Sequence, residues 1–144
     1  MQITRQTEYA IHAVIELAQI PFGDFVLIRQ IANKLNIPEM FLKKTVQALN
    51  KSGIVVTQRG TNGGVRLSRP SDKLTVADVM AAIEGPLMLN VCLGENYQCS
   101  NKPFCSIHKI LQRTQKAVLR ELSRETFADI IKNKLRLEKR VEEV

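Results

Sequence analysis

The sequence has few acidic residues, few cysteines and no long apolar stretch, and each shortage excludes a class of protein. No run reaches 18 consecutive apolar residues, which excludes a membrane-spanning helix. The N-terminus, MQITRQTEYA, lacks the apolar run of a signal peptide, so we expect a cytoplasmic protein. Three cysteines are an odd number, and cytoplasmic thiols stay reduced, which argues against a disulfide framework.

Motifs for catalysis are also missing. The sequence shows no paired carboxylates, no nucleophile motif and no cofactor-binding loop, so we expect that it is not an enzyme. The glycine-rich stretch from Arg59 to Gly64 could suggest a nucleotide-binding loop. It lacks the strand-to-helix context and the following Lys-Ser/Thr that a phosphate loop needs, so nucleotide binding is set aside.

The scarcity of acidic residues leaves a net charge of +7 over 144 residues, and the excess is uneven. Residues 1–75 carry 10 Lys and Arg against 5 Asp and Glu, whereas residues 76–144 carry 11 against 9. A basic half on a small protein is an electrostatic footprint for phosphate backbones. A solvated basic surface without a partner is the alternative that charge alone leaves open.

Two short helices joined by a tight turn are predicted within the basic half. Apolar residues stripe the stretch from Ile28 to Leu35, Asn36 and Ile37 form a turn, and Pro38 suits the first position of the next helix. The second helix should bury Leu42, Val46 and Leu49 and point outward the residues Lys43, Lys44, Gln47 and Lys51. A basic second helix is typical of a helix-turn-helix that reads the major groove; a helical hairpin with a solvated lysine face is the alternative.

A β-hairpin should follow directly. Residues 54–58 are rich in β-branched side chains and residues 65–68 form a second short strand candidate, and Asn62-Gly63 between them supplies residues able to take positive φ. A hairpin after a helix-turn-helix is a wing. Arg59 and Arg66 could then place a guanidinium in a minor groove or on phosphates.

All three cysteines and one histidine lie in a single loop. Cys92, Cys99, Cys105 and His108 are spaced C-x6-C-x5-C-x2-H, with Gly, Asn and Pro residues between the cysteines. Three thiolates and an imidazole can hold zinc or an iron–sulfur cluster, and the wide gaps favour the cluster. Structural zinc, thiols that sense oxidation directly, and ordinary unpaired thiols are the alternatives.

The remaining elements are predicted to be helical. Thr4 should cap a first helix that runs to Ile20, and Thr75 should cap another that ends at Gly85. Ser106–Leu122 is predicted as a long helix with a narrow apolar stripe, which favours packing against a second subunit over packing on its own domain. A shorter helix should begin after Thr126, and the charged end, LRLEKRVEEV, should be solvated or frayed.

Taken together, these residues resemble the IscR/NsrR/RirA-type winged-helix transcription regulators of the Rrf-two family. The resemblance covers nearly the whole chain and rests on five stretches: ITRQTEYAIHAVIELA, FLKKTVQAL, the wing RGTNGGVRLSRP, LTVADVMAAIEG, and the three cysteines before the long helix. It implies a homodimeric regulator, acting as a repressor on a palindromic operator in double-stranded DNA. It also implies that a cluster held by Cys92, Cys99 and Cys105 senses iron–sulfur status, redox or nitric oxide.

Two residues compete for the fourth ligand position that the resemblance implies. His108 matches the histidine that the IscR-like branch uses with a [2Fe–2S] cluster, and Glu8 stands where NsrR-like relatives offer a carboxylate from the other subunit to a [4Fe–4S] cluster. Lys43 departs from the acidic residue of the best-known IscR-like members, so their operator sequence does not transfer directly. The residues expected to contact DNA are Lys43, Lys44, Gln47, Arg59, Thr61, Asn62 and Arg66.

The expected fold is mainly α with a small β-hairpin wing. Residues 1–74 should form a winged helix-turn-helix DNA-binding domain whose first helix also packs on the dimer partner. Residues 75–91 should form a connecting helix and residues 92–108 the cluster-binding loop. Residues 104–144 should form the dimerisation helix and a C-terminal helix.

Overall fold

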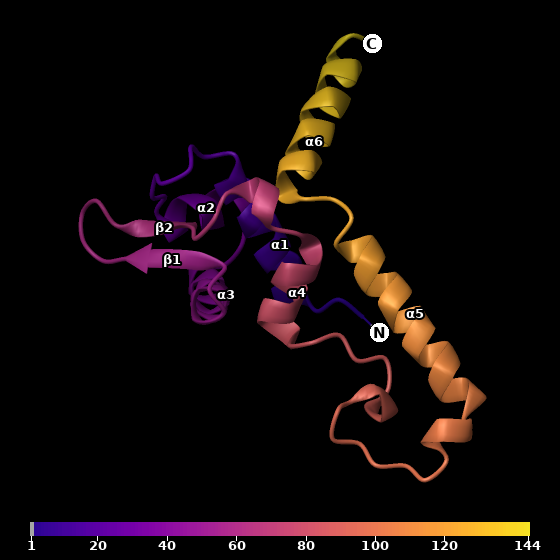
Figure 1. The fold of residues 1–144 in the computed structure, drawn as a ribbon. Coiled ribbons are helices and arrows are strands. Elements are labelled where there is room, and N and C mark those ends of the chain that lie inside the picture. Colours follow the sequence, from indigo (N-terminus) through magenta and orange to yellow (C-terminus); the bar gives the residue numbers. More distant parts are fainter. Residues whose placement is uncertain (1) are drawn as a thin grey trace.

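The computed structural model describes residues 2–144, which form six α-helices and one two-stranded sheet (Figure 1). The elements of the N-terminal half are α1 (Arg5–Ala18), α2 (Ile28–Leu35), α3 (Glu39–Lys51), β1 (Val55–Gln58) and β2 (Gly64–Leu67). Those of the C-terminal half are α4 (Val76–Glu84), α5 (Ser106–Leu122) and α6 (Phe127–Glu142). Short 3-10 turns are η1 (Ser71–Lys73), η2 (Val91–Leu93) and η3 (Lys102–Phe104). The predicted mainly helical fold with a hairpin wing is confirmed.

One hydrophobic core lies between α1, α3, α4 and the hairpin. The apolar stripes that the helical period predicts point into it, as expected for helices with one buried face. Its completely or almost completely buried members include Val14, Leu42, Val46, Leu49, Val55, Val65, Leu74, Val79 and Phe127. The last two come from α4 and α6, so the core continues past residue 74. No helix among residues 2–144 is both long and apolar enough to cross a bilayer.

Three threonines begin helices in the way that the sequence predicts. The Thr4 hydroxyl accepts the backbone N–H of Thr7 at the start of α1. At α4, Thr75 and Asp78 form a reciprocal capping box, and Thr126 does the same at α6 together with Asp129. Each box satisfies backbone N–H groups that the first helical turn leaves unpaired.

The helix-turn-helix is present, with one local difference from the prediction. Asn36 takes the left-handed conformation at φ 54° and ends α2, and Ile37 is buried beneath the turn. Pro38 lies at the N-cap of α3, one position before the first helical residue where we expected it. Its backbone is extended there, at ψ 127°, so the helix starts with Glu39 instead.

The wing is an antiparallel hairpin whose turn differs from the prediction. β1 pairs with β2 in the register Val55↔Leu67 to Gln58↔Gly64, and Val26 adds an isolated bridge to Val65. The positive-φ residues of this turn are Gly60 (106°) and Gly64 (135°), so the expectation for Asn62-Gly63 is wrong. The backbone N–H of Gly63 donates to the carbonyl oxygen of Gly60 at 3.1 Å, so Thr61 and Asn62 are the two central residues of this turn.

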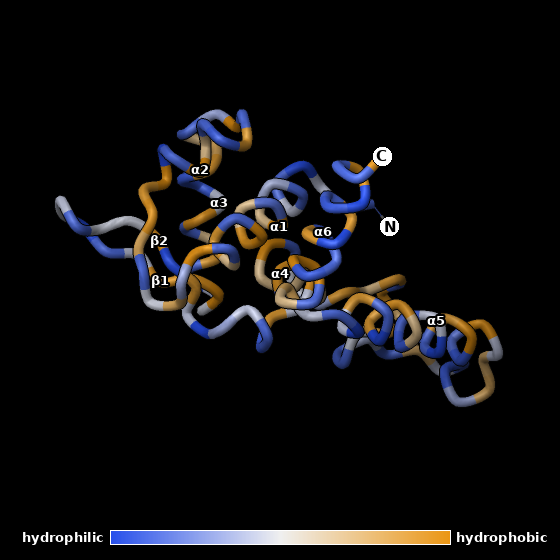
Figure 2. Tube along the Cα trace, turned by 90° about the horizontal axis from the view of Figure 1, so that it is seen from above, coloured by the Kyte–Doolittle hydropathy of each residue, from blue (hydrophilic) through white to orange (hydrophobic). Residues whose placement is uncertain are grey.

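Helices α5 and α6 leave the core in different directions. Both views show α5 extending from the body on the side away from the wing (Figures 1 and 2). None of its residues is buried, and Ile107 and Ile110 expose 62% and 46% of their surfaces. The start of α6 is anchored by Phe127, whereas residues 132–144 are exposed. The charged end is solvated as predicted, but it is helical to Glu142 instead of frayed.

Candidate functional site

A groove separates the second helix of the helix-turn-helix from the wing. It has a volume of about 940 Å³ and lies between the start of α2, the outer side of α3, and β1 with its turn. Lys43, Gln47 and Arg59 all line it, so the structure brings together three residues that the sequence assigned to DNA contact. Arg29, at the start of α2, adds a further cation.

An acidic residue holds two of these cations in place. The Glu39 carboxylate pairs with Lys43 Nζ at 3.0 Å, one turn along α3, and with Arg29 Nε at 3.5 Å. These cations, Lys43 above all, hold the pKa of Glu39 below its ordinary value. The carboxylate therefore stays ionised and ties the first turn of α2 to the outer side of α3.

The other predicted DNA contacts are placed differently. Lys44, Thr61 and Asn62 are exposed, the first on α3 and the other two at the tip of the wing. Arg66 lies on β2 and is partly buried. Its guanidinium carbon sits 5.3 Å from the centre of the Phe25 ring, and its Nη1 donates to the carbonyl oxygen of Leu67 at 3.0 Å. Arg66 therefore has its partners within the domain.

The cysteine loop connects α4 to α5 and crosses two short 3-10 turns. Cys92 lies in η2, Cys99 is exposed before η3, and Cys105 is the N-cap of α5. The backbone N–H of Leu89 donates to Gln115 Oε1 at 2.9 Å, which fastens the beginning of the loop to the middle of α5. The loop thus contacts the middle of α5 before it leads into the first turn of that helix.

The four predicted ligands are gathered only in part. Cys99 and His108 line one open groove of about 700 Å³, together with Lys102 and Lys109; Cys92 and Cys105 are not among its lining residues. Among residues 2–144, no three His, Cys, Asp or Glu side chains form a group that could hold a metal ion. The physical reason is general: loops rich in thiol ligands are gathered by ligation, because the free donor groups have little attraction for one another.

Two hydrogen bonds and one unpartnered buried atom nevertheless suit a soft-metal ligand set. Asn90 Nδ2 donates to Cys92 Sγ at 3.4 Å, and the backbone N–H of His108 donates to Cys105 Sγ at 3.3 Å. Hydrogen bonds of this kind stabilise thiolate ligands and tune the group that they hold. His108 Nδ1 is buried and finds no hydrogen-bond partner among residues 2–144, although a buried polar atom normally has one. The donor set therefore fits an iron–sulfur cluster chemically.

Glu8, the alternative fourth ligand, lies on α1. Its carboxylate pairs with Arg5 Nη1 at 3.3 Å, and its side chain remains 48% exposed. An exposed carboxylate on the outer side of α1 is accessible to a second subunit.

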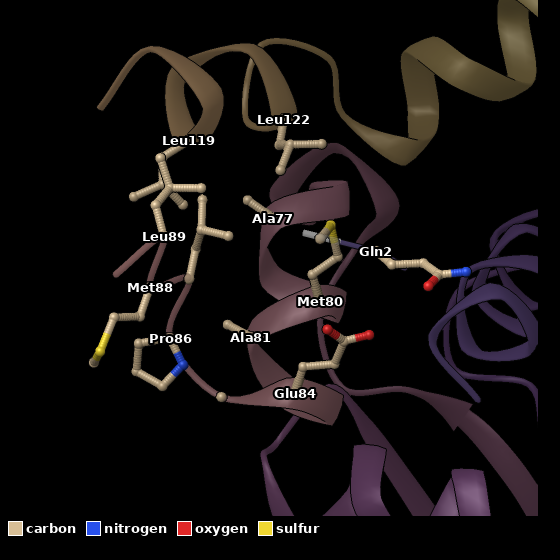
Figure 3. A pocket seen from close by; sticks show the side chains of 12 residues that line it. Gln2, Ala77, Met80, Ala81, Glu84, Pro86, Met88, Leu89, Leu119 and Leu122 are labelled. Atoms are coloured by element: carbon tan, nitrogen blue, oxygen red, sulfur yellow. The ribbon is translucent and has the colours of Figure 1, made fainter. Parts of the chain in front are cut away.

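A pocket of about 380 Å³ lies where α4, the beginning of the cysteine loop and the end of α5 meet (Figure 3). Figure 3 shows Met80 and Ala77 of α4 facing Leu119 and Leu122 of α5, with residues 85–89 along one side. Glu84, at the other end, ties the pocket to α1 through hydrogen bonds from Thr4 and Thr7. The position of α5 therefore depends on few contacts with the core.

The sequence analysis did not single out Asn90, Glu39 or Arg29. Asn90 could have been recognised, because an Asn two positions before a cysteine is a local donor to its sulfur. Arg29 could not, because its place in the groove depends on how α2 crosses α3.

Comparison with known proteins places this arrangement in one family. Residues 3–133 match the family model described as "Rrf2: Iron-dependent Transcriptional regulator". CymR (YrzC), the global cysteine regulator of B. subtilis, is similar in structure with a TM-score of 0.71 and 26% sequence identity, over 90% of this chain and 95% of that one. IscR of T. potens gives a TM-score of 0.70 and 25% identity, over 92% of this chain and 88% of that one.

Proposed function

The chain belongs to the Rrf2 family of DNA-binding transcription regulators, and we propose that it is a homodimeric repressor whose operator affinity depends on an iron–sulfur cluster in the loop of residues 92–108. The observation that supports this proposal is that two features occur together in one short chain. One is a basic groove between a helix and a wing, and the other is a loop that holds every cysteine. That loop leads into α5, the helix outside the core.

On DNA, α3 enters the major groove and the wing lies along the neighbouring backbone. Lys43 and Lys44 contact phosphates, and Gln47 reaches base edges, where an amide can both donate and accept. Arg59, Thr61 and Asn62 of the wing contact the backbone or the minor groove. Arg66 is left out of this set, because its guanidinium already lies over the Phe25 ring.

Cys92, Cys99 and Cys105 are the proposed cluster ligands, with His108 as the fourth. The unpartnered Nδ1 of His108 supports this choice, as do the N–H donors on two of the cysteine sulfurs. The family resemblance implies a [2Fe–2S] cluster if His108 is the fourth ligand, and a [4Fe–4S] cluster in the alternative in which the partner subunit supplies Glu8. When bound, such a cluster supplies redox sensitivity, sensitivity to nitric oxide and sensitivity to iron supply.

Dimerisation is proposed to use the apolar side of α5. Ile107 and Ile110 are exposed on a helix with no buried residue, and an uncovered apolar stripe on a long helix favours packing against a copy of itself. Two winged domains joined in this way match a palindromic operator.

Coupling between the loop and DNA follows from the connectivity. The loop sits between α4, which is part of the core, and α5, which would fix the spacing of two recognition helices. A change in the loop therefore changes that spacing. A coupling free energy of about 1–3 kcal/mol would alter operator affinity roughly 5- to 150-fold.

The test is anaerobic purification followed by visible absorbance and the iron-to-sulfide ratio. The samples are the wild type, His108→Ala, Glu8→Ala and, as a matched control, His12→Ala on the exposed side of α1. We expect a coloured wild type whose cluster is altered by His108→Ala and unchanged in the control. A loss confined to Glu8→Ala would assign the fourth ligand to α1 of the partner.

Two alternatives predict other results for the same samples. A colourless protein with stoichiometric zinc would indicate a structural zinc site. A protein without metal that cannot be reconstituted would indicate unligated thiols, which either sense oxidation directly or are ordinary unpaired thiols. Either result would overturn the cluster while leaving DNA binding to be measured separately.

A further inference from the structure

Helix α3 carries an apolar side chain in the middle of its solvent-facing polar side. Met40, in the first turn, exposes 75% of its surface, whereas Lys43, Lys44 and Gln47 around it are charged or polar. Single exposed apolar residues are common on protein surfaces, so the exposure of Met40 alone is no evidence of a function. The position of Met40 on the helix is what gives it meaning.

The buried side of α3 is formed by Leu42, Thr45, Val46 and Leu49. At about 100° of rotation per residue, Met40 lies opposite the middle of that stripe and shares its side of the helix with Lys44, one turn later. In a helix-turn-helix, the N-terminal residues of the recognition helix are those that reach base edges. Met40 therefore occupies the place where a base-reading residue belongs.

The first turn of α3 is held firmly enough to fix this place. The Phe41 ring meets the Tyr9 ring edge to face, with centroids 5.3 Å apart and planes at 89°. The Thr45 hydroxyl donates to the carbonyl oxygen of Phe41 at 3.1 Å. Glu39 is tied to Arg29 of α2. The backbone at residue 40 is thus anchored from both sides, while the methionine side chain itself stays adaptable.

Methionine limits which group in a major groove can be its partner. Its thioether donates no hydrogen bond and accepts only weakly, so it satisfies neither phosphates nor the keto and amino groups of base edges. The apolar group exposed in the major groove is the C5-methyl of thymine. Covering that methyl removes apolar surface from water on both partners.

We propose that Met40 reads a thymine in each operator half-site, through contact between the end of its side chain and the thymine methyl group. The inference rests on the proposed function, because it requires that α3 binds operator DNA. It adds a base identity to an interface otherwise described by charge and hydrogen bonding.

The test is a thermodynamic cycle on a defined operator. The operator is first selected from a random duplex library with the wild-type protein, prepared as purified under anaerobic conditions. Each thymine is then replaced, one at a time, by deoxyuridine, which lacks only the methyl group. Dissociation constants are measured for the wild type, Met40→Ala and Lys44→Ala at one fixed salt concentration.

For the wild type we expect one thymine per half-site whose replacement weakens binding about fourfold, equivalent to ~0.8 kcal/mol for one buried methyl group. Met40→Ala should bind the thymine and deoxyuridine operators alike at that position. Lys44→Ala should bind both more weakly and keep the difference. Met40 is exposed, so its replacement should leave unfolding unchanged.

Three results would contradict this inference in distinguishable ways. If every deoxyuridine replacement is neutral for the wild type, Met40 reads no methyl group. If Met40→Ala keeps the full sensitivity, another residue reads it. If the wild type selects no sequence from the library, the proposed operator recognition fails as well.

Discussion

The backbone N–H of Phe127 donates a hydrogen bond of 2.9 Å to the carbonyl oxygen of Leu74. The neighbouring residues Thr75 and Thr126 form an antiparallel bridge. The two segments are far apart in sequence, and their contact returns the chain from α5 to the core of the winged domain. The side chains of Leu74 and Phe127 are completely buried, with 0% exposure. The winged domain is therefore completed by residues that come after the cysteine loop.

Phe127→Ala should destabilise the protein by about 3–5 kcal/mol, because it leaves a large cavity in that core. Urea unfolding followed by circular dichroism measures the change. The matched control is Leu135→Ala on the same helix, where the side chain is 50% exposed and the expected loss is within about 0.5 kcal/mol. Equal effects of the two substitutions would show that α6 does not complete the core.

Gly64→Ala should destabilise the wing more than Gly60→Ala. Both glycines have positive φ, which costs other residues about 1–3 kcal/mol. A Cβ at Gly64 would also lie 2.3 Å from the carbonyl oxygen of Val26, whereas nothing lies within 4 Å of one at Gly60. Thermal unfolding of the two variants checks the order, and a larger loss for Gly60→Ala would contradict it.

Glu84→Gln should lower stability at neutral pH and have less effect in acid. The buried Thr7 hydroxyl, together with the N–H and hydroxyl of Thr4, hydrogen-bonds the carboxylate and holds the pKa of Glu84 below its ordinary value of 4.5. A lowered pKa stabilises the fold above the unfolded value and loses that contribution as the pH falls through the folded one.

Because this carboxylate is exposed, the expected difference at pH 7 is only ~0.5–1 kcal/mol. Unfolding free energies between pH 7 and pH 3 should show the wild type and Glu84→Gln converging below about pH 4.5. Glu142→Gln, at the exposed end of α6, serves as the control. A gap that stays constant with pH would mean that the carboxylate charge contributes nothing.

Lys44→Ala should weaken binding to specific and random duplexes by similar factors. If its ammonium group contacts a phosphate, the slope of log K against log salt should fall in magnitude by about 0.9. Fluorescence anisotropy at several salt concentrations measures both effects. Lys139→Ala, on the exposed part of α6, should change neither. An unaltered slope in Lys44→Ala would contradict the assignment of α3 as the helix that contacts DNA.

Ile110→Lys should shift the protein from dimer to monomer, because it places a charge in the apolar side of α5 that we propose as the interface. Sedimentation velocity over a range of concentrations reports the change. Arg113→Ala on the same helix removes a side chain that is exposed and polar, and should leave the dimer intact. A monomeric wild type would contradict the proposed interface.

Local chemistry determined most of the fold. Helical periodicity placed α3 with Leu42 and Leu49 inward and Lys44 outward, and the structure confirms it. Thr75 and Thr126 begin α4 and α6 because a hydroxyl that accepts a backbone N–H acts within one helical turn. Such signals need no knowledge of the rest of the chain, so the sequence alone displays them.

Long-range contacts decided what the sequence could not. Arg66 stacks on Phe25, and Phe127 fills a core begun more than 100 residues earlier, because both depend on which surfaces meet after folding. The positive φ angles of the wing lie at Gly60 and Gly64 instead of Asn62-Gly63, and residue 64 must be a glycine because the carbonyl of Val26, distant in sequence, leaves no room for a side chain there. Cys92, Cys99 and Cys105 were predictable as a donor set from their spacing. Their convergence is not, because ligation would have to supply the free energy that gathers them.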